Sequence, residues 1–136
     1  SKEKAVKNME KAWLNSPIPQ MAEEYTEMLV GLKMFDKCRE VLKNLEVDII
    51  CRARIKIVAA RTAFAEQNLE EAERIINNVT LTNIRECETT LTDLWFEIQA
   101  AKKAKLLGKK PTVELLETVK TTLKPPENID FRMSEY

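Results

Sequence analysis

Hydrophobic residues recur at helical spacing along most of this chain. Phe35, Cys38, Leu42 and Leu45 are separated by three, four and three positions, which places them on one face of an α-helix. The segment 69–79 repeats this spacing and predicts a second helix of the same kind. Its expected inward residues are Leu69, Ala72, Ile76 and Val79.

The same period predicts five further helices, at about 2–14, 19–33, 50–64, 91–107 and 112–123, which makes seven. Their expected inward residues are Ala5, Met9, Ala12 and Trp13; Ala22, Tyr25, Leu29 and Leu32; Ile50, Ala53, Ile57, Ala60 and Phe64; Leu91, Leu94, Trp95, Ile98 and Ala101; and Val113, Leu116, Val119 and Leu123. With only 2 glycines and 5 prolines, the composition also favours long helices. The sequence therefore predicts an all-α fold of about seven antiparallel helices.

Local signals place several helix ends. Pro19 suits a first helical turn, where its missing donor costs nothing. Thr90 and Asp93 are a candidate capping box for the 91–107 helix. Pro125 and Pro126 end the last helix. The residues after them predict an extended, strand-like C-terminal tail.

An offset of 34 residues relates two parts of the chain. Small or apolar residues of one predicted helix pair each have a small or apolar counterpart 34 positions later, in the next helix pair. The matched positions are Thr26 with Ala60, Leu29 with Ala63, Val30 with Phe64, Phe35 with Leu69, Cys38 with Ala72, Val41 with Ile75, Leu42 with Ile76, and Leu45 with Val79. The chain therefore contains an internal repeat of two helices.

Residues 3–83 resemble the tetratricopeptide repeat family, whose unit is a 34-residue pair of antiparallel helices. Ala5, Cys38 and Ala72 match its small residue in the second helix, and Asn68-Leu69-Glu70-Glu71-Ala72 is similar to its turn-and-helix pattern. Ala60 matches a small residue of the first helix, Thr26 does so more loosely, and Pro17 matches the closing proline. Lys56 departs from the pattern where an aromatic is usual, and no proline closes the repeats near Ile50 or Ile84.

The resemblance implies one helical-repeat domain over 1–136, an α-α superhelix (a tetratricopeptide-like solenoid) of right-handed twist. Residues 1–18 would be the second helix of a truncated repeat, 19–52 and 53–86 two repeats, 87–124 a divergent closing pair, and 125–136 the extended tail. Family members bind through the face of their first helices. The positions carried over are Gln20, Glu23, Glu27, Val30, Arg54, Ile57, Arg61 and Phe64. This set does not match the subgroup that clamps a chaperone's terminal carboxylate.

The C-terminal part is similar to the end of a group of large bacterial proteins. The similarity is carried by Leu-Thr-Asp-Leu-Trp-Phe-Glu at 91–97 and Pro-Pro-Glu-Asn-Ile-Asp-Phe-Arg-Met at 125–133. Those proteins place a β-sandwich domain of unknown function, related to carbohydrate-processing domains, before a long tetratricopeptide array. The similarity implies that this chain is the terminal part of such an array.

Apolar residues in the tail suggest that it folds back. Ile129, Phe131 and Met133 would share one side of an extended segment, and burial would offset the cost of ordering it. We expect this side to contact Trp95 or Phe96, or to bridge to another domain. Phe96 cannot share the inward stripe with Trp95, so its role stays open between core and binding.

The chain offers little chemistry. It has no histidine, which removes the commonest general base and metal ligand, and we predict no metal and no cofactor. Glu23, Glu24 and Glu27 lie within one helical turn and are read as a solvated face. Cys38, Cys51 and Cys87 form no C-x-x-C pair and are expected to fill the core. The lysines at 102, 103, 105, 109 and 110 suit a helix C-terminus, with phosphate binding as the alternative.

These features together predict a non-catalytic scaffold for protein–protein or interdomain contacts, and a piece of a larger protein. Its partner would be a protein, a peptide or another domain of the same full-length chain. The balance of 22 basic and 22 acidic residues disfavours nucleic acid and membrane surfaces as partners. A cytoplasmic location is expected. The alternative is an accessory region that buttresses a carbohydrate-active enzyme, and the preceding sequence of the gene would discriminate the two.

Overall fold

A computed structural model describes residues 1–79 and 88–129, and all regular structure within them is helical. This confirms the prediction of an all-α chain. The elements are α1 (Lys2–Asn15), α2 (Pro19–Gly31), α3 (Phe35–Lys43), α4 (Val47–Ile50), α5 (Ala53–Ala65), α6 (Leu69–Asn77), α7 (Glu88–Leu106), α8 (Val113–Thr122) and the short 3-10 turn η2 (Glu127–Ile129).

Two helical hairpins, α2–α3 and α5–α6, have the same backbone plan. Their helices are 13 and 9 residues long in both cases, and each boundary of the second hairpin lies 34 residues after its counterpart. The turn residues Lys33 and Gln67 both adopt positive φ, 60° and 65°. Met34 N–H donates to Leu29 O at 2.8 Å in one turn, and its counterpart in the other turn is 2.9 Å long. The 34-residue offset found between apolar positions of the sequence thus also relates the helix boundaries and turns of the backbone.

Small residues allow the two helices of each hairpin to approach closely. Thr26 and Cys38 are fully buried in the first hairpin, as are Ala60 and Ala72 in the second. The Cys38 thiol lies 3.9 Å from the carbonyl oxygen of Thr26, so side chain meets backbone directly. A longer side chain at these positions would have to displace the neighbouring helix.

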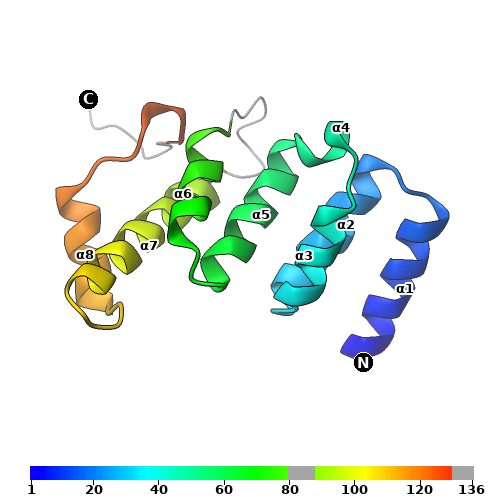
Figure 1. Ribbon diagram of the computed structural model, residues 1–136, viewed down its shortest axis with the longest axis horizontal. Coiled ribbons are helices and arrows are strands. Elements are labelled where there is room, and N and C mark those ends of the chain that lie inside the picture. Colours follow the sequence, from blue (N-terminus) through cyan, green and yellow to red (C-terminus); the bar gives the residue numbers. More distant parts are fainter. Residues whose placement is uncertain (80–87, 130–136) are drawn as a thin grey trace.

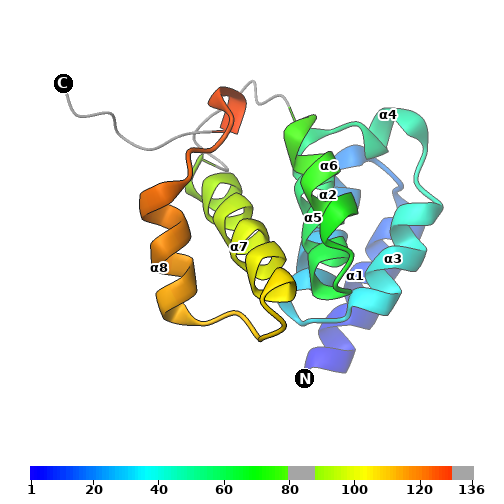
Figure 2. The ribbon, with the colours of Figure 1, turned by 60° about the vertical axis from the view of Figure 1, so that its left-hand side comes forward.

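The hairpins stand side by side in a row, with α1 at one end and α8 at the other (Figures 1 and 2). α1 packs on α2, α2 on α5, α5 and α6 on α7, and α7 on α8. The middle helix α5 is therefore covered on two flanks. Ile55 and Val58 join the core shared with α1–α4, whereas Ile57 and Ala60 join the core shared with α6–α8 and η2.

The pair α7–α8 is a third hairpin with a different turn. α7 is longer, at 19 residues, and it is followed after Leu106 by a turn in which Gly108 has φ 67°. Lys109 N–H donates to Ala104 O at 3.0 Å, the hydrogen bond of a helix-ending Schellman turn that also closes α2 and α5. Thr112 then caps α8 by accepting a hydrogen bond from Leu115 N–H at 3.1 Å.

Several boundaries differ from those predicted. The 50–64 stripe is split, because Arg52 is extended at φ −69° and ψ 142° and separates α4 from α5. α4 therefore adds an eighth α-helix among the described residues. α7 begins at Glu88, so Thr90 lies inside the helix and the predicted capping box is wrong. Residues 80–87, including Cys87 and Ile84, lie outside the described residues.

Some expected core positions are also wrong. Val113 is 75% exposed and Leu123 is 42% exposed, whereas Leu115 is buried with Val119, because α8 turns a different side towards α7. Ala5 is exposed, and Val6 is the buried residue of α1. Cys51 is exposed at the end of α4 and does not fill the core.

The segment after Pro126 turns back onto the helices. Glu127–Ile129 forms a 3-10 turn that contacts α6 and α7, so these residues are not extended as predicted. Ile129 is fully buried, and its carbonyl oxygen accepts a hydrogen bond from Thr92 Oγ1 at 2.6 Å. Phe131 and Met133, the other predicted contacts of the tail, lie outside the described residues.

Candidate interaction surfaces

The first helices of the two hairpins, α2 and α5, lie against one another, and each carries four of the eight predicted groove residues. Their accessibility differs widely. Gln20 is exposed, Glu23 and Ile57 are buried, and Glu27, Val30, Arg54, Arg61 and Phe64 are half-buried. Glu23 and Ile57 are therefore closed to a partner, whereas the other six residues keep some exposed surface.

An ion-pair network joins α2 to α5 at this position. The carboxylate of Glu23 accepts from Arg52 Nε at 3.2 Å and lies 3.7 Å from Arg54 Nη1. The carboxylate of Glu27 accepts from Arg54 Nε at 3.1 Å. Two acidic residues of one hairpin thus hold two basic residues of the next, and we call these four residues the Glu–Arg lock.

Burial makes the lock a structural feature. The side chain of Glu23 is only 5% exposed, so its charge depends on the two arginines for compensation. The predicted solvated acidic face is therefore wrong for Glu23, whereas Glu24 is exposed as expected. Both carboxylates of the lock accept hydrogen bonds from arginine, and these bonds join the two hairpins.

What stays accessible on α2 and α5 is a mixed surface. Gln20 is exposed at the start of α2, and Arg61 and Phe64 are half-buried along α5. Phe64 packs against the core shared with α6–α8, so only part of its ring is available. The remaining surface offers a cation, an amide and an aromatic edge, which suits a peptide.

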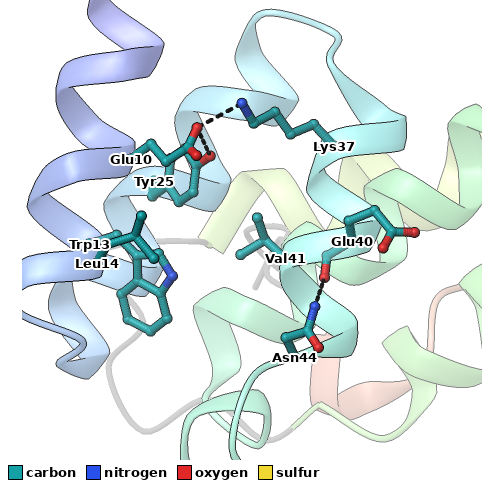
Figure 3. A pocket seen from close by; sticks show the side chains of 8 residues that line it. All are labelled: Glu10, Trp13, Leu14, Tyr25, Lys37, Glu40, Val41 and Asn44. Carbon is teal, nitrogen blue, oxygen red and sulfur yellow. Dashed lines mark hydrogen bonds and ion pairs between the residues drawn. The ribbon is translucent and has the colours of Figure 1, made fainter.

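A pocket of about 270 Å³ lies between α1 and α3 (Figure 3). One end is polar, where Glu10 Oε2 accepts from Lys37 Nζ at 2.8 Å and from Tyr25 OH at 3.4 Å. The other end is formed by Trp13, Leu14, Val41 and Asn44. Leu14 is 67% exposed.

The three ionisable groups at the polar end of this pocket each keep one protonation state around neutral pH. The hydrogen bond from Lys37 lowers the pKa of Glu10, and the same bond raises the pKa of Lys37. Burial raises the pKa of Tyr25. At neutral pH the pocket therefore holds a carboxylate, an ammonium and a neutral phenol, and none of these three titrates near neutrality. The pocket can therefore accommodate a partner's side chain beside charges that stay fixed around neutral pH.

The side chains predicted to meet the tail share one core. Trp95 and Phe96 are both buried, with ring centroids 5.3 Å apart in an edge-to-face arrangement, and Ile129 joins the same cluster. Phe96 reaches this core although it follows Trp95 directly, because α7 is enclosed by α6, α8 and η2. No sequence feature indicated that Phe96 would be buried, because a residue directly after Trp95 falls outside the one apolar stripe predicted for this helix.

Among the residues that the structure describes, no group of three histidine, cysteine, aspartate or glutamate side chains is arranged to hold a metal ion. The same part of the chain has no helix that is long and apolar enough to span a bilayer. No protein-family model, curated protein or solved structure matches this chain.

Proposed function

We propose that this chain is a non-catalytic helical-repeat scaffold of the tetratricopeptide type, which binds a protein, a peptide or another domain of a larger bacterial protein in the cytoplasm. The observation that carries the proposal is the repeated hairpin, with the same helix lengths and the same turn 34 residues apart. Repeats of this kind contact mainly their neighbours and leave long outer surfaces for partners.

The Glu–Arg lock supports this proposal. It joins consecutive hairpins through their first helices, so that the surfaces of α2 and α5 keep a defined relation. A preorganised surface binds with less loss of conformational entropy than a flexible one. The lock thus contributes to binding by holding Gln20 and Arg61 in place.

Selection of peptides from a displayed random library against the whole chain tests the proposal. We expect binders that the double variant Gln20→Ala/Arg61→Ala weakens by about tenfold, since two polar contacts at an interface are worth about 1–2 kcal/mol together. The matched control is Asp36→Ala/Lys43→Ala, which removes one charge of each sign from exposed positions of α3 outside the pocket of Figure 3. The control should change the affinity by less than about twofold.

The proposal fails if the selected peptides bind both double variants equally well, or if no binder emerges. Gln20 is exposed and Arg61 is half-buried, so both variants should fold. An unchanged circular dichroism spectrum of each variant would exclude unfolding as the cause of weaker binding. A peptide whose affinity falls in the Gln20/Arg61 variant and not in the α3 control supports the scaffold proposal.

A further inference from the structure

A basic groove lies at the far end of the second hairpin, where the α5–α6 turn faces the end of α7. Two adjoining hollows of about 670 Å³ and about 290 Å³ share Gln67, Leu69 and Lys105 among their lining residues. Lys102 lines the first hollow, and Lys109 and Lys110 line the second. We call these two hollows together the basic groove.

The charge of this groove departs from that of the chain. The whole sequence has as many acidic as basic residues, yet among the described residues four lysines line the groove against one carboxylate, Glu70. Lys102 is held by Glu73 at 3.0 Å. Lys105, Lys109 and Lys110 are exposed, so their ammonium groups can reach an incoming ligand.

Stabilisation of the α7 dipole does not account for all of these lysines. Lys103 and Lys105 stand in the last turn of α7, where a cation is favourable. Lys109 and Lys110 follow the helix, beyond the Schellman turn at Gly108, and still line the hollow. That turn brings them back towards the α5–α6 turn, next to Lys105.

The groove is also partly apolar. Leu106 lines the first hollow and is 87% exposed, and Pro111 lines the second. An exposed leucine amid lysines offers a contact that a simple anion cannot use, because phosphate has no apolar surface. A peptide with carboxylates on both sides of a large apolar side chain uses both features.

We propose that the basic groove binds an acidic peptide segment that carries an apolar residue between its carboxylates. This inference rests on the proposed scaffold function and names its partner class at a second surface. Carboxylates would pair with Lys105, Lys109 and Lys110, and the apolar residue would lie against Leu106. Such exposed charge pairs each contribute modestly and weaken as salt is added.

Fluorescence anisotropy with the whole chain and a labelled peptide, Asp-Glu-Asp-Phe-Glu-Asp-Glu, tests the inference. The double variant Lys105→Ala/Lys109→Ala should weaken binding about tenfold, because two charge pairs of about 0.5–1 kcal/mol each are lost. The matched control Lys103→Ala/Lys124→Ala removes the same charge from exposed positions outside the groove lining. It should weaken binding less than about threefold.

Two further measurements separate the apolar from the ionic contribution. Replacing the phenylalanine of the peptide by alanine, or Leu106→Ala in the chain, should each weaken binding severalfold, and the two changes together should cost little more than either alone. Raising the salt from about 50 to about 500 mM should weaken binding of the parent peptide.

The inference is overturned if the two lysine double variants lose affinity equally, which indicates unspecific attraction. It is also overturned if inorganic phosphate or a single-stranded oligonucleotide competes fully and the phenylalanine does not matter, which indicates a general anion site. If library peptides still depend on Arg61 while the acidic peptide does not bind, the scaffold proposal stands and only this inference falls.

Discussion

The hairpins α2–α3 and α5–α6 share one backbone but differ in what covers them. The first is backed by α1, and between α1 and α3 it leaves the pocket of Figure 3. The second is enclosed by α7 and η2, and the inward residues of α6, together with Val79 after it, are buried. In the first hairpin, by contrast, Phe35 and Leu45, which match Leu69 and Val79, stay half-buried.

This difference teaches that the turn and the helix crossing, not the full set of apolar contacts, define the repeat. The two hairpins keep a positive φ at Lys33 and Gln67 and bury small residues at equivalent positions, although their outer faces meet different neighbours. Variants that act on the junction, the cover, the crossing and the turn should therefore have separable effects.

The largest effect is expected at the junction between the hairpins. Arg52→Ala/Arg54→Ala leaves the buried carboxylate of Glu23 without these two partners, and breaking a buried pair in this way costs about 3–5 kcal/mol. Urea unfolding would measure the loss. Arg39→Ala is the control, since its pair with Glu66 is partly exposed and worth less than about 1 kcal/mol. Equal midpoints for the two variants would contradict a structural role for the lock.

The second-largest effect on stability is expected at Ile129, which covers the second hairpin. Ile129→Ala removes a fully buried side chain between α6 and α7 and should cost about 2–5 kcal/mol. The reason is lost apolar burial together with the cavity that remains. Thermal unfolding followed by circular dichroism would measure the effect. Val113→Ala is the control, because Val113 is 75% exposed and should tolerate the change.

The crossing should respond more weakly. Ala72→Leu places a longer side chain where α6 meets α5, and overpacking of this kind costs about 1–3 kcal/mol. Cys38→Leu tests the equivalent position of the first hairpin and should cost a similar amount. Glu70→Ala, on the exposed side of α6, should leave the urea midpoint nearly unchanged. An unchanged midpoint for Ala72→Leu would show that the crossing has room, and that the small residues are not required.

Hydrophobic periodicity predicted the buried residues of helices that have a single buried face. All four inward residues expected in the segment 69–79 are buried, because one face of α6 meets the core and the other meets solvent. In α5 the same reasoning found Ile57 and Ala60 but missed Ile55 and Val58. A helix covered on two flanks has two buried faces, and a single stripe cannot describe both.

The Glu–Arg lock could not be predicted in this way. Arg52 lies 29 residues from Glu23 and stands in an extended position before α5, so no helical period relates the two. The pairing depends on how two hairpins stack. Alignment of the repeats pointed to the surface of α2 and α5 without indicating that Glu23 is buried there.

The smallest effect concerns the turns, and here the two hairpins should behave alike. Lys33 and Gln67 adopt a left-handed conformation that costs a residue with a side chain about 1–2 kcal/mol. Glycine removes that cost but adds about 0.4–1 kcal/mol of unfolded-state entropy. Lys33→Gly and Gln67→Gly should therefore each stabilise the chain by about 0.5–1 kcal/mol, measured by urea unfolding.

The third hairpin supplies the reverse experiment. Gly108 already occupies the equivalent position at the end of α7, with φ 67°, and a Cβ added there would meet no atom within 4 Å. Gly108→Ala should thus lose about 0.5–1 kcal/mol through backbone conformation alone. Opposite signs for Gly108→Ala and for the two glycine variants would establish that one turn conformation is required at all three hairpins. A gain at Gln67 without one at Lys33 would mean that the Lys33 side chain makes a stabilising contact, and the equivalence of the two turns would then extend to the backbone only.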